Sequence, residues 1–192
     1  MGIRDVVPWV GMKRIELYRH SIKTQPGNAD LSPDGVTLAE KIGEGLRGKA
    51  FTHLFVSSLK RTQDTMDAFA RAAGDFPHVP YAVFLPHTSV SNTQEGLSLW
   101  SGACNRAEHR GEDKMRAALK EEPEIAQRVA KEGAESFRRF VEQLPDGACA
   151  LVVDHSPFLE LVVYGLFDVV MKQLGFCEGF VIEEHDGVLK LV

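Results

Sequence analysis

The sequence predicts an α/β fold, a three-layer α/β/α sandwich with a mostly parallel sheet, an antiparallel edge strand and a helical cap insertion. Short apolar segments alternate with longer segments whose apolar residues recur at helical spacing, which is typical of a sheet covered by helices on both faces. The length of 192 residues suits one domain with an insertion. We expect a single domain over residues 12–192, a cap at about 86–132, and an N-terminal extension over residues 1–11.

The first half of the chain contains two strand and helix pairs and a third strand. Ile15–Tyr18 reads as the first strand, and Ser32-Pro33 marks a helix start because Ser caps helix N-termini and Pro suits the first helical position. Gly48 ends that helix. The remaining elements expected here are a strand at residues 53–56, a helix at 59–73 and a short strand at 81–85.

The second half begins with the polar cap segment, which is rich in Ala, Glu, Lys and Arg in its later part and is therefore interpreted as mostly helical. Residues 148–153 form an apolar run of the kind found in a central strand covered on both faces. Residues 158–174 are apolar nearly all round, which predicts a buried helix. Asp186-Gly187 predicts a hairpin turn. The other expected elements are a helix at 133–144 and strands at 180–183 and 188–192.

Charge and cysteine content exclude several classes of function. Lys and Arg total 22 against 27 Asp and Glu, so the formal net charge is −5. Nucleic acids and anionic membranes require basic surface, and we expect neither as a partner. The three cysteines lie far apart with no CxxC pair, and no closely spaced histidines indicate a metal. We therefore expect no metal, no cofactor and a cytoplasmic location.

Three polar segments follow predicted parallel strands, namely Arg19-His20, Ser57–Arg61 and Asp154-His155. The carboxyl ends of such strands share one edge of the sheet, where ligands bind in this class of fold. An arginine fork matches the oxygens of a phosphoryl group. A neutral histidine can attack phosphorus to form a covalent intermediate, and a second histidine can stabilise the charge that develops. These segments indicate phosphoryl transfer.

Leu17-Tyr18-Arg19-His20 resembles the opening Arg-His-Gly motif of the histidine phosphatase superfamily, which includes the cofactor-dependent phosphoglycerate mutases. Later segments resemble further motifs of that family and occur in the family's order, so that the resemblance covers roughly Arg14 to Leu161. These segments are Leu31–Gly35 with Ala39, Val56–Thr65, Gly133–Ser136 and Val152–Ser156.

The resemblance implies a role for each matching residue. His20 is expected to be the nucleophile that carries the phosphoryl group. Arg19 and Arg61 are expected to hold the phosphoryl oxygens, and His155 to complete the pocket. The family often takes its general acid from a Glu in the cap, and Glu95, in Gln94-Glu95-Gly96-Leu97, is the candidate here.

Three further residues are expected to contact phosphate. Asn28 lies in the loop where the family often has a phosphate-contacting Asn. Ser21 stands where the family usually has Gly, and its hydroxyl is small enough to reach the phosphate. Ser156 follows the second histidine.

We therefore expect a metal-independent phosphatase that hydrolyses phosphomonoesters through a phosphohistidine on His20. The substrate is expected to be a small phosphorylated molecule or a phosphoprotein. Two alternatives stay open, a phosphoglycerate mutase-type phosphotransferase and a non-catalytic relative that binds a phosphorylated ligand. The sequence does not indicate the oligomeric state.

Overall fold

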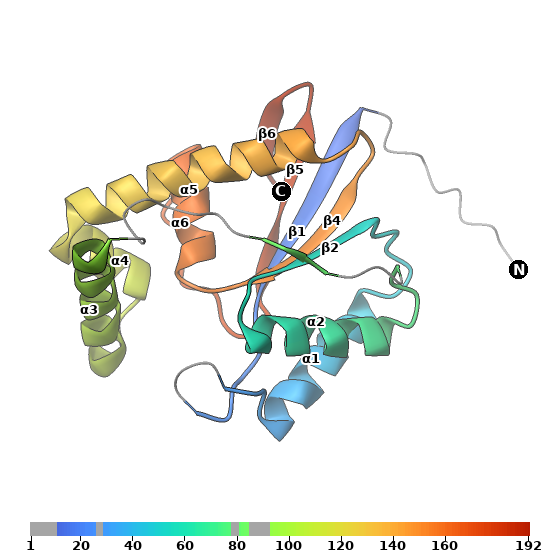
Figure 1. The fold of residues 1–192 in the computed structure, drawn as a ribbon, viewed down its shortest axis with the longest axis horizontal. Coiled ribbons are helices and arrows are strands. Elements are labelled where there is room, and N and C mark those ends of the chain that lie inside the picture. Colours follow the sequence, from blue (N-terminus) through green and yellow to red (C-terminus); the bar gives the residue numbers. More distant parts are fainter. Residues whose placement is uncertain (1–10, 26–28, 78–80, 85–92) are drawn as a thin grey trace, which may run out of the picture.

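The computed structural model describes residues 11–25, 29–77, 81–84 and 93–192, and Figure 1 shows their arrangement. These residues contain six strands and six helices. In chain order they are β1 (Met12–Arg19), α1 (Pro33–Gly45), β2 (His53–Val56), α2 (Lys60–Ala73), β3 (Ala82–Val83), α3 (Gln94–Arg110), α4 (Lys114–Glu121), α5 (Pro123–Gln143), β4 (Cys149–Asp154), α6 (Phe158–Phe167), β5 (Gly179–His185) and β6 (Val188–Leu191).

The six strands form one sheet in the order β3-β2-β4-β1-β5-β6. The first four strands of that order run parallel, while β5 is antiparallel to β1, and β6 is antiparallel to β5. The predicted α/β class, with a mostly parallel sheet and an antiparallel edge, is confirmed. Arg19 pairs with Asp154 and Val56 pairs with Val153, so the last residues of β1, β2 and β4 lie side by side.

Each face of the sheet carries its own hydrophobic core. Leu151 and Val153 of β4 pack with Phe69 of α2 on one face, and Val152 packs with Phe137 of α5 on the other. β4 is buried along its whole length because helices cover both of these faces. In Figure 1, α3 and α4 stand to the left of the sheet, beside the first turns of α5.

Two helices differ from the prediction. α5 begins at Pro123 and crosses the expected cap boundary without a break, because buried Ala126, Val129 and Ala130 continue the helical spacing into the cap. The helix expected to reach residue 174 ends at Phe167, so that prediction was wrong. Asp168 adopts the left-handed conformation with φ of 56° and ends α6, and residues 168–178 follow as an irregular segment. We call residues 168–178 the post-α6 segment.

β3 also differs from the prediction, because within residues 81–84 the strand comprises Ala82 and Val83 alone. Leu85 of the expected strand lies outside the described residues.

Candidate active site

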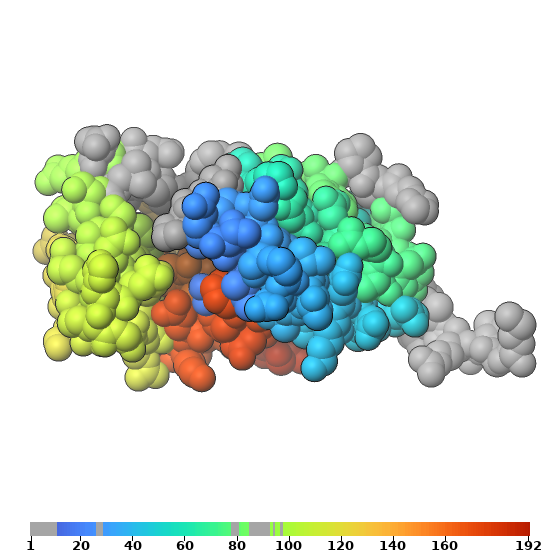
Figure 2. Space-filling model, turned by 90° about the horizontal axis from the view of Figure 1, so that it is seen from below, coloured from blue at the N-terminus to red at the C-terminus, as the bar shows by residue number. Residues whose placement is uncertain are grey.

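The polar residues that follow β1, β2 and β4 meet at the carboxyl edge of the sheet. The backbone N–H of His20 donates to the carbonyl of Asp154 at 2.9 Å, and that of Ser57 donates to the carbonyl of Val153 at 3.3 Å. Arg61, in the first turn of α2, reaches the same place. Figure 2 views the molecule from this end. The segment after β1 lies there against the orange region that follows β4, with the yellow-green cap helices to the left.

The hydrogen bonds of His20 identify its unprotonated nitrogen. Its Nδ1 lies 2.7 Å from the carbonyl of Ser21, which can only accept, so Nδ1 carries the proton. The Nε of Arg61 donates to Nε2 at 3.2 Å. Burial lowers the pKa of His20 to about 4, and the positive charge of Arg61 adds to this effect. His20 is therefore a neutral imidazole whose Nε2 lone pair faces the site, as a nucleophile requires.

His155 lies beside His20, with 5.2 Å between the ring centroids. Its Nε2 is 2.8 Å from the hydroxyl of Ser57, which is itself 3.0 Å from the hydroxyl of Thr62. Its Nδ1 is buried and has no hydrogen-bond partner among the described residues. Burial lowers the pKa of His155 to about 2. The ring is thus neutral, oriented through one nitrogen and available to a ligand through the other.

Arg19 is held by the post-α6 segment. Its Nη1 donates to the carbonyl of Leu174 at 2.5 Å, and its guanidinium lies 4.3 Å from the ring centre of Phe176. Its Nε is buried and has no partner among the described residues. A buried unpaired donor is costly, and a phosphoryl oxygen would satisfy it. Arg19 and His155 therefore both present unpaired nitrogens at the edge where His20 presents its lone pair.

The hydroxyl groups that were expected to contact phosphate are bound elsewhere. The Oγ of Ser21 donates to the carbonyl of Gly35 at 2.7 Å, and the Oγ of Ser156 donates to Glu160 at 2.5 Å. Asn28 lies outside the described residues. Gly35 is required where it stands, because a Cβ would lie 2.0 Å from the carbonyl oxygen of Ile22. Ser21 therefore joins the loop after β1 to α1.

Two buried carboxyl groups lie behind the histidines and the arginines. Burial raises the pKa of Asp154 to about 8, so this carboxyl is largely protonated at neutral pH. Burial also raises the pKa of Glu160. Glu160 accepts the backbone N–H of Leu174 at 2.7 Å and so fixes the segment that holds Arg19.

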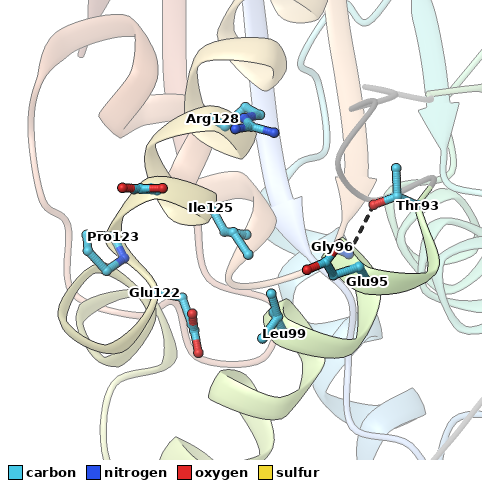
Figure 3. Close-up of a pocket in the computed structure, with 9 residues that line it drawn as sticks. Thr93, Glu95, Gly96, Leu99, Glu122, Pro123, Ile125 and Arg128 are labelled. Atoms are coloured by element: carbon cyan, nitrogen blue, oxygen red, sulfur yellow. Dashed lines mark hydrogen bonds between the residues drawn. The ribbon is translucent and has the colours of Figure 1, made fainter.

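The cap places a different glutamate near the site from the one expected. Glu95 lies in the first turn of α3 and lines a cavity of about 560 Å³ with Leu99, Ile125 and Arg128 (Figure 3). Glu108 lies 13 residues further along α3, about 20 Å away along the helix axis. Glu108 is in electrostatic range of Arg19. The structure thus brings Arg19, His20, Arg61 and His155 together and does not join Glu95 to them.

Several residues of the site carry no signal in the sequence. Leu174 acts through its carbonyl group, which every residue has, and Phe176 lies in a stretch without periodicity. Glu160 is the exception, because a carboxyl group in an otherwise apolar helix can be seen in the sequence. Glu108 shares its polar helix with a second glutamate, Glu95, so only its position in three dimensions distinguishes it.

In the part of the chain that the structure describes, three or more His, Cys, Asp or Glu side chains nowhere form a group that could hold a metal ion. Among the same residues, each helix is too short or too polar to span a bilayer.

Comparison with known proteins gives the family of this chain. The chain belongs to the histidine phosphatase superfamily (branch 1), whose family model matches residues 16–176. A search of curated proteins gave no match.

Similar solved structures include three enzymes. A phosphoglycerate mutase from Bacillus anthracis is 13% identical, with a TM-score of 0.69 over 95% of this chain and 92% of that one. A mutant phosphoserine phosphatase from Entamoeba histolytica, in complex with phosphoserine, is 15% identical, with a TM-score of 0.63 over 94% and 95%. A mycobacterial glucosyl-3-phosphoglycerate phosphatase is 16% identical, with a TM-score of 0.60 over 94% and 97%. At these identities the likeness concerns the fold.

Proposed function

We propose that this protein is a metal-independent phosphatase that hydrolyses phosphomonoesters through a phosphohistidine intermediate on His20. The observation that carries the proposal is the hydrogen bonding of His20, whose Nδ1–H is bound to a carbonyl and whose Nε2 is unprotonated. The unpaired buried nitrogens of Arg19 and His155 support it. Membership of a superfamily that includes phosphatases and mutases supports it as well.

In the proposed first step, the phosphoryl oxygens of the substrate bind the Nε edge of Arg19 and the guanidinium of Arg61. Arg61 gives up its bond to Nε2 of His20 to do so. The Nε2 lone pair attacks phosphorus, and the bond from phosphorus to the ester oxygen breaks. The carbonyl of Ser21 stabilises the positive charge that develops on the ring, because it accepts the Nδ1 proton. Nδ1 of His155 donates to the charged oxygens in the transition state.

In the second step, water attacks the phosphorus of the phosphohistidine, and the bond from phosphorus to nitrogen breaks. His20 returns to its neutral form with the release of inorganic phosphate. The first step requires His20 to be unprotonated at the outset, and its low pKa of about 4 meets that requirement at neutral pH.

The leaving group receives little help from the described part of the cap. A hydrogen bond from Lys114, at 3.1 Å, lowers the pKa of Glu108 and keeps this carboxylate ionised. An ionised carboxylate cannot donate a proton. We therefore propose that preferred substrates have leaving groups that depart without protonation, as aryl phosphates do. Glu95, the sequence-based candidate for the acid, stays a prediction.

The test is hydrolysis of p-nitrophenyl phosphate between pH 5 and pH 8 in EDTA, with wild type, His20→Ala and His185→Ala compared. His185 is exposed on the hairpin and serves as the matched control. We expect turnover by the wild type and the control in EDTA, and none by His20→Ala. Acid-labile, base-stable phosphate on the quenched wild type would identify phosphohistidine. Wild-type turnover by His20→Ala would refute the proposal.

The two alternatives give other results in the same series. A mutase would interconvert 3-phosphoglycerate and 2-phosphoglycerate faster than it hydrolyses either. A binding relative would bind inorganic phosphate with Arg19 and Arg61 and turn over no ester. For the cellular setting we propose the cytoplasm, since all three cysteines are free and buried.

A further inference from the structure

The post-α6 segment links Arg19 to the cap. On the Arg19 side, the carbonyl of Leu174 accepts Nη1 of Arg19 at 2.5 Å, and the ring of Phe176 lies under the guanidinium. The backbone N–H of Cys177 also donates to the carbonyl of Arg19 at 3.1 Å. This segment therefore sets where the guanidinium lies.

On the cap side, two reciprocal hydrogen bonds hold Gln173. Its backbone N–H donates to Oδ2 of Asp113 at 2.7 Å, and its Oε1 accepts the backbone N–H of Lys114 at 3.0 Å. Asp113 is the N-cap residue of α4, and its other oxygen, Oδ1, accepts the backbone N–H of Arg116 at 3.0 Å. One carboxylate thus begins a cap helix and binds the post-α6 segment.

The residue after Gln173 is the one that binds Arg19. Leu174 donates its N–H to Glu160 and accepts Nη1 of Arg19 through its carbonyl. A shift of Gln173 turns the peptide group between the two residues and moves Leu174 with it. The path from Asp113 to the guanidinium of Arg19 therefore consists of two hydrogen bonds and the backbone of Gln173 and Leu174.

We propose that Asp113 is a positioning residue of the phosphoryl-binding site, which acts on Arg19 through Gln173 and Leu174 and couples the seating of the cap to the affinity for the phosphoryl group. The proposal rests on the proposed function in assigning the phosphoryl group to Arg19. Asp113 does not touch the ligand. A guanidinium held in one orientation loses less freedom when it binds an oxyanion, so release of Gln173 weakens binding.

The experiment is calorimetric titration of the full chain with inorganic phosphate. Asp113→Asn is the test variant, because Asn caps helices as well as Asp does but places an NH₂ group where Gln173 needs an acceptor. Glu112→Gln is the matched control. It removes the same charge one residue earlier, where Glu112 is exposed and pairs with Arg110. Both variants are also made in an Arg19→Ala background.

We expect Asp113→Asn to weaken phosphate binding about tenfold, as loss of a charge-assisted hydrogen bond does. Glu112→Gln should change it less than about twofold, as surface charges do. In the Arg19→Ala background, Asp113→Asn should have no further effect, because a residue that acts through Arg19 has nothing left to act on. A merely structural role would lower the unfolding temperature without producing this non-additivity.

Three results would overturn the proposal. They are unchanged phosphate affinity in folded Asp113→Asn, an equal loss with and without Arg19, and no binding of phosphate by the wild type. Should Asp113→Asn fail to fold by circular dichroism, Asp113→Ser replaces it, since Ser also caps helix N-termini but has no second oxygen for the N–H of Gln173. The titration needs no turnover, so its outcome is independent of the hydrolysis assay that tests the proposed function.

Discussion

The buried carboxyl of Asp154 makes a testable contribution to the pH dependence of stability. This residue is 3% exposed at the end of β4, and burial raises its pKa from 3.8 to about 8. Between these two values the folded chain holds a proton that the unfolded chain has lost. The stability associated with this proton is therefore complete below pH 3.8 and is lost as the pH rises toward 8.

The isosteric change Asp154→Asn removes this titration. One pH unit across the window corresponds to about 1.4 kcal/mol for one proton. From pH 3.8 to pH 7 the wild type should therefore lose up to about 4 kcal/mol that the variant keeps. The histidines His20 and His155 change the free energy of unfolding in the opposite direction. Their pKa values are lowered in the folded chain, so the unfolded chain binds protons more readily and the folded chain loses stability as the pH falls below 6.5. Both proteins contain them, so the difference isolates Asp154.

The assay is urea unfolding followed by circular dichroism at pH 5, 6, 7 and 8. We expect the variant's free energy of unfolding, relative to the wild type, to rise by about 1.4 kcal/mol per pH unit and to level off above pH 8. Asp146→Asn, at an exposed turn, is the control and should show no such trend. A difference between Asp154→Asn and wild type that does not vary with pH would refute the reasoning, because Asp154 would then be ionised in the folded chain.

Three predictions concern catalysis. The pKa of His20 predicts that kcat/KM, corrected for substrate ionisation, falls on the acid side only near pH 4. A fall of kcat/KM already near pH 6.5 would show that the pKa of the histidine is not lowered. Ser57→Ala removes the hydroxyl partner of His155 and should lower kcat about tenfold with little change in KM; an effect on KM alone would contradict an orienting role. Because Glu108 is ionised, kcat/KM should rise steeply from alkyl to phenyl to p-nitrophenyl phosphate, and equal rates would reveal an acid.

The sequence determined the fold class and four residues of the candidate site. Parallel strands end at one edge, so the residues after each strand must meet there whatever the details of packing. This reasoning brought Arg19-His20, Arg61 and His155 to the carboxyl edge, where the structure has them. The residue types then indicated phosphoryl chemistry, because arginine and histidine perform it through side chains that a sequence displays.

Tertiary structure alone decided which cap residues face the site. Glu95 and Glu108 lie at opposite ends of α3, and only the packing of the cap decides which end approaches Arg19. The hydroxyl groups of Ser21 and Ser156 donate to protein acceptors, because a small side chain binds whatever acceptor packing brings within reach.

The irregular structure of the post-α6 segment and its contact with Arg19 could likewise not be predicted from the sequence. An apolar stretch there reads as continued helix, whereas Asp168 ends α6 and Glu160 binds the backbone of Leu174. The segment acts on Arg19 largely through a carbonyl group and on Asp113 through an N–H group. Such groups are common to nearly all residues, so their roles follow from position in three dimensions and leave no pattern in the chain.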